Sequence, residues 1–130
     1  MKKSFVVILT LFLSAFAVQA QGGAVATQDS IYFEKTTHDY GTIAYGADGG
    51  CEFVFLNKGK SPLVLTNVHA SCGCTIPEWP KEPISPGKTG VIKVKYNTNL
   101  TGPFRKSISV SSNAANSLVS LTITGSVTPQ

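Results

Sequence analysis

The stretch VIKVKYN at residues 91–97 alternates apolar and polar side chains from Ile92 onward, and CEFVFLN at residues 51–57 places its two phenylalanines at alternate positions, 53 and 55. Successive side chains of a strand point to opposite faces of a sheet, so this alternation is typical of a strand with one buried and one solvated face. The segments between such stretches are rich in glycine, proline, asparagine and serine, which favour turns. The sequence therefore predicts an all-β fold.

Strands are expected at residues 31–37, 51–57, 63–70, 91–97, 104–111 and 118–127, with a short irregular strand near 83–84. Short strands at this spacing predict an immunoglobulin-like antiparallel β-sandwich of about seven strands. The alternation assigns these side chains to its interior: Phe53, Phe55, Ile92, Val94, Tyr96, Phe104, Ile108, Val110, Val119, Leu121 and Ile123.

The N-terminal segment has the pattern of a secretory signal peptide. Lys2 and Lys3 precede an apolar stretch at residues 5–13, and small residues lead up to Ala20. The apolar run is shorter than the roughly 20 residues that a spanning helix needs. We expect cleavage after residue 20, export to the periplasm or the extracellular space, and a soluble chain that does not span the membrane. Residues 21–30 are expected to form a flexible leader, and residues 31–130 a single domain.

Composition excludes several function classes. Loss of Lys2 and Lys3 leaves nine Lys and Arg against seven Asp and Glu, a net charge of +2. No run of basic residues remains, so we expect no nucleic-acid partner. The chain has no paired-carboxylate, phosphate-loop or triad signature, so we expect no enzymatic activity.

The segment SCGCT at residues 71–75 is the chemically unusual part of the chain. If the strands run up and down the sandwich, the start of 51–57 and the end of 63–70 lie at the same pole. That pole would gather Cys51, Cys72 and Cys74, the loops around Tyr45 and 99–102, and the segment 75–83 that carries Trp79. This pole is therefore one candidate for a functional site.

Several pieces of the chain match the pattern of a known family: Phe33, HDYGTI at 38–43, FVFLNKG at 53–59, PLVL at 62–65, SCGCT at 71–75, PG at 86–87, GPF at 102–104 and TITGSV at 122–127. The chain resembles a secreted bacterial family of unknown function with this Ser-Cys-Gly-Cys-Thr motif. The resemblance implies an immunoglobulin-like domain, related in shape to Hydin-type and major-sperm-protein-type modules, and export. It implies no established activity, and Cys51 departs from the family pattern.

Three cysteines in an oxidising compartment can form at most one bridge within the chain. A bridge from Cys51 to either partner closes a loop of over twenty residues, worth about 3 kcal/mol, whereas a Cys72–Cys74 bridge removes little unfolded-state entropy. Cys51 is equally well interpreted as a small buried side chain on the face of Phe53. Gly73 would permit the tight conformation of a Cys72–Cys74 bridge, which would be easily reduced. The pairing stays open at this point.

His69, Cys72 and Cys74 suggest a metal site, with spacings of three and two residues. Two thiolates and an imidazole suit Cu(I), and Cys51 as a fourth ligand would complete a tetrahedral zinc site. The alternative is that His69 faces solvent at a strand end, because one Cys-x-Cys pair is weaker evidence than two.

Trp79 and Tyr45 are the aromatic candidates for a binding surface, although Trp79 could equally cap one end of the core. His38 and Asp39 are expected to fix a turn before Gly41 through local hydrogen bonds of the aspartate. Two functional hypotheses follow. The first is an exported, non-enzymatic module that binds a protein or envelope component through the cysteine-bearing pole or an open sheet edge. The alternative is a thiol redox or Cu(I)/Zn-binding protein.

Overall fold

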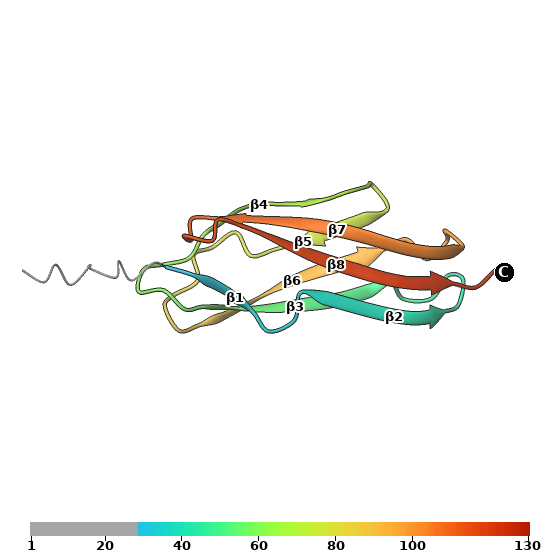
Figure 1. The fold of residues 1–130 in the computed structure, drawn as a ribbon, viewed down its shortest axis with the longest axis horizontal. Helices are drawn as coiled ribbons and strands as arrows, with labels where there is room; N and C mark the ends of the chain where they lie inside the picture. Colours follow the sequence, from blue (N-terminus) through green and yellow to red (C-terminus); the bar gives the residue numbers. More distant parts are fainter. Residues whose placement is uncertain (1–28) are drawn as a thin grey trace, which may run out of the picture.

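A computed structural model of the chain describes residues 29–130, which form eight strands. The strands are β1 (Ile31–Phe33), β2 (Thr37–Ile43), β3 (Gly50–Asn57), β4 (Leu65–Ala70), β5 (Thr75–Glu78), β6 (Thr89–Tyr96), β7 (Gly102–Ser112) and β8 (Leu118–Val127). They make two four-stranded sheets, ordered β1-β3-β6-β5 and β2-β8-β7-β4. Figure 1 shows the strands running along the long axis of the molecule. The predicted all-β, immunoglobulin-like sandwich is confirmed.

One pairing departs from the expected antiparallel arrangement. β2 pairs with β8 in parallel, whereas the other paired neighbours are antiparallel. β1 pairs with β3 in the first sheet, so the chain changes sheets between Phe33 and Thr37. This switch makes the second sheet mixed, because β2 enters it beside the C-terminal strand.

The core lies between the sheets and follows the alternation of the sequence. Every side chain expected in the interior is buried except Val119, which is half-buried against the core. Tyr96 and Phe104 stack across the sheets with ring centroids 3.8 Å apart. Apolar burial of about 25 cal/mol per Å² is the main force holding such a sandwich together.

Two strands were not expected from the sequence, and three expected strands are shorter, one of them the strand expected at 63–70, which begins at Leu65. β2 reads THDYGTI and β5 reads TIPE, so neither shows clean alternation over its length. The strand expected at 31–37 ends at Phe33, where the chain leaves the first sheet. The strand expected at 83–84 is a single bridge between Leu63 and Ile84.

The expected turn at His38 and Asp39 is instead an irregularity inside β2. The pairing of β2 with β8 shifts register between Asp39 and Thr42. The N–H of Gly41 donates to Asp39 Oδ1 at 2.8 Å, and Gly41 has a φ of 64°, which favours glycine. The local hydrogen bond of the aspartate is therefore present, but it shapes a bulge rather than the end of a strand.

The signal peptide expected at residues 1–20 and most of the leader expected at 21–30 lie outside the described residues. The last two leader residues are held by the turn after β3. Asp29 Oδ1 accepts hydrogen bonds from the N–H groups of Lys60 and Ser61, and Lys58 N–H donates to the Ser30 carbonyl. In residues 29–130 there is no helix with the length and apolar character to span a membrane.

Candidate functional site at the cysteine pole

Three connections meet at the end of the sandwich that carries the C-terminus (Figure 1). They are residues 44–49 between β2 and β3, 71–74 between β4 and β5, and 97–101 between β6 and β7. We call this surface the cysteine pole. The N–H of Gly46 donates to the Thr98 carbonyl at 3.2 Å, and Thr98 Oγ1 donates to the Ala47 carbonyl at 2.6 Å. Asn97 N–H donates to the Cys74 carbonyl at 2.9 Å, so all three connections form one continuous surface.

The cysteine pole is nearly neutral and exposes two large apolar side chains. Asp48 is the one charged residue in its three connections. Tyr45 is 37% exposed and Leu100 is 45% exposed. A hollow of about 560 Å³ lies between residues 46–48 and 95–99. Leu100 was not singled out in the sequence, although an apolar residue in the polar loop NTNLTG is a usable signal.

Cys72 and Cys74 form a disulfide with each other inside the turn 71–74, with Cα atoms 5.3 Å apart. Both cysteines are half-buried, and Cys74 packs against the core. Cys74 Sγ lies 3.9 Å from the hydroxyl of Thr75, the first residue of β5. Gly73 between them does not have a positive φ. The bridge therefore forms with ordinary backbone at its centre.

Cys51 is free, which corrects the alternative in which it would bridge Cys72 or Cys74. It lies near the start of β3, and β6 separates β3 from β5. Its thiol packs against the core and interacts with the Tyr40 hydroxyl. Burial raises the pKa of the Cys51 thiol above its ordinary value, the Tyr40 hydrogen bond lowers the pKa, and the Glu52 charge raises it. Cys51 is thus a small, half-buried side chain that packs against the core.

Tyr40 in β2 hydrogen-bonds to the loop 44–49 of the cysteine pole. Its hydroxyl donates to the Gly49 carbonyl at 2.6 Å, which ties β2 to the start of β3. Burial is the main cause that raises the pKa of Tyr40, followed by its hydrogen bond with Cys51. Tyr40 is therefore a neutral hydrogen-bond donor that fixes the loop 44–49.

His69 lies in β4, where its neighbours Val68 and Ala70 are buried and its own side chain is exposed. Among residues 29–130, no group of three or more His, Cys, Asp or Glu side chains is placed to hold a metal ion. Cys72 and Cys74 hold each other as a disulfide and offer no thiolate in this form. The Cu(I) or zinc site therefore stays a prediction for the reduced protein.

Trp79 does not lie at the cysteine pole, contrary to the expectation for segment 75–83. β5 begins with Thr75 opposite Tyr96 and ends with Glu78 opposite Lys93, so the chain leads away from the pole. Trp79 is half-buried and packs against the core. Lys81 Nζ lies 3.0 Å from the centroid of its ring. This placement favours a structural role for Trp79.

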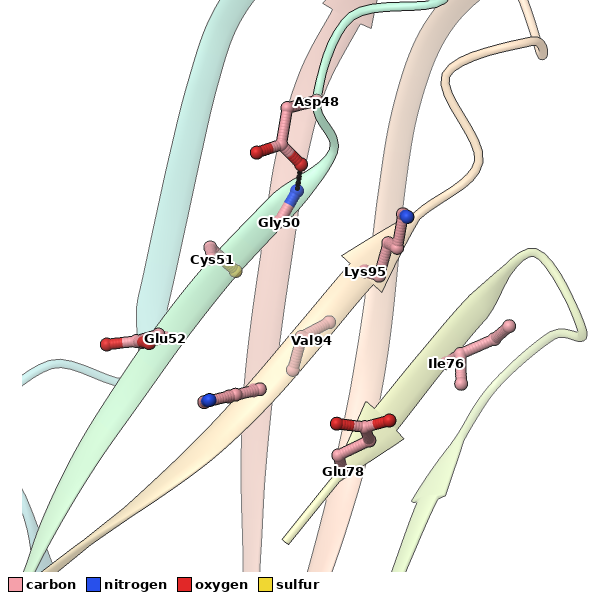
Figure 2. A pocket seen from close by; sticks show the side chains of 9 residues that line it. Asp48, Gly50, Cys51, Glu52, Ile76, Glu78, Val94 and Lys95 are labelled. Atoms are coloured by element: carbon pink, nitrogen blue, oxygen red, sulfur yellow. Dashed lines mark hydrogen bonds between the residues drawn. The ribbon is translucent and has the colours of Figure 1, made fainter.

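A second hollow, of about 610 Å³, lies on the outer face of β3, β6 and β5 beside the pole. Figure 2 shows Glu52, Glu78 and Lys95 around it. Glu52 pairs with Lys93, which in turn pairs with Glu78, so opposite charges alternate across three strands. Cross-strand pairs of opposite charge stabilise a solvated sheet face. We therefore assign a structural role to Glu52, Lys93 and Glu78.

Both edges of the first sheet are closed to a further strand. At β1, the Ile31 N–H donates to Asn116 Oδ1 at 3.0 Å, and Asn116 Nδ2 donates to the Ile31 carbonyl at 2.8 Å. At β5, the Asn97 N–H donates to the Cys74 carbonyl, and every second residue of an antiparallel strand bonds to the same neighbour. Residues 74, 76 and 78 therefore direct their backbone groups toward β6, and residue 77 directs its backbone groups away from β6. That residue is Pro77, which has no N–H to offer.

Residues 31–127 match a family described as protein of unknown function, DUF1573. The chain belongs to this family. A search of curated proteins found no match. The family match agrees with the expected resemblance to a family of unknown function, while secretion, the Ser-Cys-Gly-Cys-Thr motif as a family feature, and the Hydin-type and major-sperm-protein-type relations stay predictions.

Solved structures with the same fold come from distant proteins. A protein of unknown function from Porphyromonas gingivalis is 18% identical, with a TM-score of 0.69 over 78% of this chain and 48% of that one. This chain therefore spans about half of that protein. The seventh PapD-like domain of human CEP192 is 6% identical, with a TM-score of 0.67 over 80% and 89% of the two chains. The CsuC–CsuE chaperone–tip adhesion subunit complex of Acinetobacter baumannii gives 12% identity and a TM-score of 0.51 over 77% and 57%. These likenesses show the fold alone.

Proposed function

We propose that the chain is an exported, non-enzymatic module that binds a protein or envelope component through the cysteine pole. The carrying observation is the pair of exposed side chains Tyr45 and Leu100 on a nearly neutral, hydrogen-bonded surface. Aromatic residues are enriched and charged residues are depleted at the centres of protein interfaces. The pole has this composition.

The pole is also held in shape before any partner arrives. The bonds Gly46 to Thr98, Thr98 to Ala47 and Asn97 to Cys74 fix three connections against one another. A surface that is already ordered loses less conformational entropy on binding than a flexible one. This favours the pole as a contact surface over an irregular loop of the same composition.

Strand addition at the first sheet is the weaker route to binding. Asn116 occupies the backbone of β1, and Pro77 removes the outward N–H of β5. The fold is compatible with either mode, because it also occurs in a complex of a chaperone with a tip adhesion subunit. The closed edges of the first sheet therefore favour the loops of the cysteine pole over strand addition at that sheet.

Export of the module rests on its N-terminal pattern. Lys2 and Lys3, the apolar stretch 5–13 and the small residues up to Ala20 are the features of a signal peptide. A disulfide within a turn is also consistent with an oxidising compartment.

Capture from an envelope extract of the native host tests the proposed surface. The exported chain is immobilised as wild type, as the double variant Tyr45→Ala/Leu100→Ala, and as Leu118→Ala. Leu118 is the matched control, because it is 67% exposed at the start of β8, at the opposite end of the sandwich. We expect the double variant to capture about tenfold less partner than the wild type, because large side chains at the centre of an interface carry most of its binding energy. Leu118→Ala should capture as much partner as the wild type. Equal capture by the double variant would refute the proposed surface.

A further inference from the structure

The Cys72–Cys74 bridge closes a single turn and holds no distant parts of the chain together. β4 ends at Ala70 and β5 begins at Thr75, so the bridge lies wholly within the connection between consecutive strands. The turn is also fixed without the sulfurs, because Ser71 N–H donates to the Ser107 carbonyl and Asn97 N–H donates to the Cys74 carbonyl, each at 2.9 Å. Opening the bridge therefore leaves the strand pairing and the core in place.

The outer side of this turn is open to an approaching sulfur. A Cβ atom built on Gly73 would meet nothing within 4 Å, and Gly73 has no positive φ that would require glycine. Neither contacts outside the two flanking cysteines nor a positive φ thus require a glycine at this position. Gly73 is exposed and Cys72 and Cys74 are each partly exposed, and exposed disulfides are the ones that exchange readily.

The two sulfurs have different surroundings. Cys74 packs against the core, whereas Cys72 does not. The hydroxyl of Thr75, which is buried, lies 3.9 Å from Cys74 Sγ and can donate to a thiolate that forms there. Cys72, which does not pack against the core, is therefore the sulfur that is more open to an external thiolate, and Cys74 is the better leaving group.

We propose that Cys72–Cys74 is a thiol–disulfide exchange site that takes two electrons from a dithiol. One thiolate of the dithiol attacks Cys72 Sγ, the bond between the two sulfurs breaks, and Cys74 leaves as a thiolate beside the Thr75 hydroxyl. The second thiolate of the dithiol then attacks the first sulfur of the dithiol, which is bonded to Cys72 Sγ in the mixed disulfide. That bond breaks, and Cys72 leaves as a thiolate. The dithiol ends as a disulfide, and Cys72 and Cys74 end as thiols after each takes up one proton.

Cys51 takes no part in this exchange. β6 lies between its strand and β5, and its side chain packs into the sandwich beside Tyr40. The exchange therefore does not scramble into other pairings. This inference does not depend on the docking role of the pole, because the chemistry is measured with small thiols.

Equilibration of the full exported chain with mixtures of glutathione and glutathione disulfide tests the proposal. Samples are quenched with acid and alkylated, and the mass of the intact chain counts its thiols. We expect a reversible change between one thiol and three, with the same midpoint from the oxidised and the reduced side and with the sandwich folded in both forms. A bridge that glutathione leaves intact in the folded protein would overturn the proposal, as would a bridge that includes Cys51.

Single-cysteine variants separate the roles of the two sulfurs. Cys74→Ser leaves Cys72 as the free thiol of the turn, and Cys72→Ser leaves Cys74. We expect the first variant to form a mixed disulfide with glutathione disulfide about tenfold faster than the second, because access controls such rates. Equal rates would overturn the assignment of Cys72 as the attacked sulfur.

Thr75→Val and Thr75→Ser test the hydroxyl as a positioning group for Cys74. We expect Thr75→Val to slow reduction by dithiothreitol several-fold, Thr75→Ser to restore the rate, and both to unfold at a similar urea concentration. The pH profile of alkylation of Cys74 in reduced Thr75→Val should move to higher pH, because the thiolate loses a donor. An unchanged rate and an unchanged profile would remove Thr75 from the mechanism.

Discussion

At the scale of single residues, Cys51 differs from the other two cysteines in its surroundings. Burial raises the pKa of its thiol above the ordinary 9.0. The folded chain therefore keeps the thiol proton at a pH where the unfolded chain has lost it. The resulting contribution to stability is fully present below pH 9.0 and is lost as the pH rises further.

This difference predicts slow modification of Cys51. We expect iodoacetamide at pH 8 to alkylate Cys51 at least about tenfold more slowly in the folded, oxidised protein than in urea, because only an accessible thiolate reacts. Timed alkylation with mass spectrometry measures both rates. Similar rates would show that the Cys51 thiol is not buried and that its pKa is not raised.

Asp29 gives a prediction in the acidic range. Its pKa lies below the ordinary 3.8 because the Lys60 N–H first, and then the side chain and N–H of Ser61, donate to its carboxylate. A depressed pKa contributes stability above the unfolded value, and this contribution is lost as the pH falls through the folded pKa. Urea midpoints should show Asp29→Asn less stable than wild type at pH 7, with the gap closing below pH 3.8. A gap that is constant with pH would contradict this.

The burial of single side chains could be predicted from the sequence, whereas the pairing of the cysteines could not. The interior assignment of Phe53 and Ile92 follows from alternation alone, because a strand has only two faces. The pairing of the cysteines depends instead on β6 lying between β3 and β5, which is a property of the sheet order. For this reason the three possible bridges could not be separated beforehand.

At the scale of elements, Gly90 and Gly73 differ in the space that surrounds them, so the second serves as a control for the first. A Cβ on Gly90 in β6 would collide with the Phe55 ring, whereas one on Gly73 would meet nothing within 4 Å. We expect Gly90→Ala to destabilise the fold by about 2–3 kcal/mol through overpacking. Gly73→Ala should stay within about 0.5 kcal/mol of wild type. Urea unfolding measures both, and equal losses would contradict this packing of β3 against β6.

Asn57 organises the turn that follows β3. It is fully buried, its Nδ2 donates to the carbonyls of Ser61 and Ile84 at 2.8 Å, and its Oδ1 accepts from the Gly59 N–H at 2.9 Å. Asn57→Ala removes three buried hydrogen bonds and leaves the Ser61 carbonyl and the Gly59 N–H without the Asn57 partner, while the Ile84 carbonyl still accepts from the Leu63 N–H, so we expect a loss of about 3 kcal/mol. The exposed Asn67→Ala is the control and should cost under about 0.5 kcal/mol. A loss for Asn57→Ala as small as that of the control would refute the role of Asn57.

The elements missed from the sequence are those whose formation depends on the rest of the fold. β2 contains a bulge at Gly41, and β5 contains Pro77, so neither has the period of a strand. Each is a strand because it pairs with a long neighbour, β8 or β6, whose alternation is clear. Local pattern therefore found the central strands and missed two edge strands.

At the scale of the whole molecule, the up-and-down course of the strands brings residues 44–49, 71–74 and 97–101 to one end. The sequence predicted that Cys72, Cys74 and Tyr45 would meet there, and the structure places all three at the cysteine pole. Trp79 was assigned to the same end, but β5 runs away from the pole and carries Trp79 onto the core. Strand direction, which alternation does not encode, decides this difference.

Site-specific photo-crosslinking in the native host tests the central claim, that the cysteine pole is the contact surface. A photoreactive amino acid is placed at Tyr45, at Leu100, and at Leu118 as the exposed control at the opposite end. We expect Tyr45 and Leu100 to yield a crosslinked product of the same mass, and Leu118 to yield none. Products from Leu118 alone, or no product from either pole position, would contradict the account.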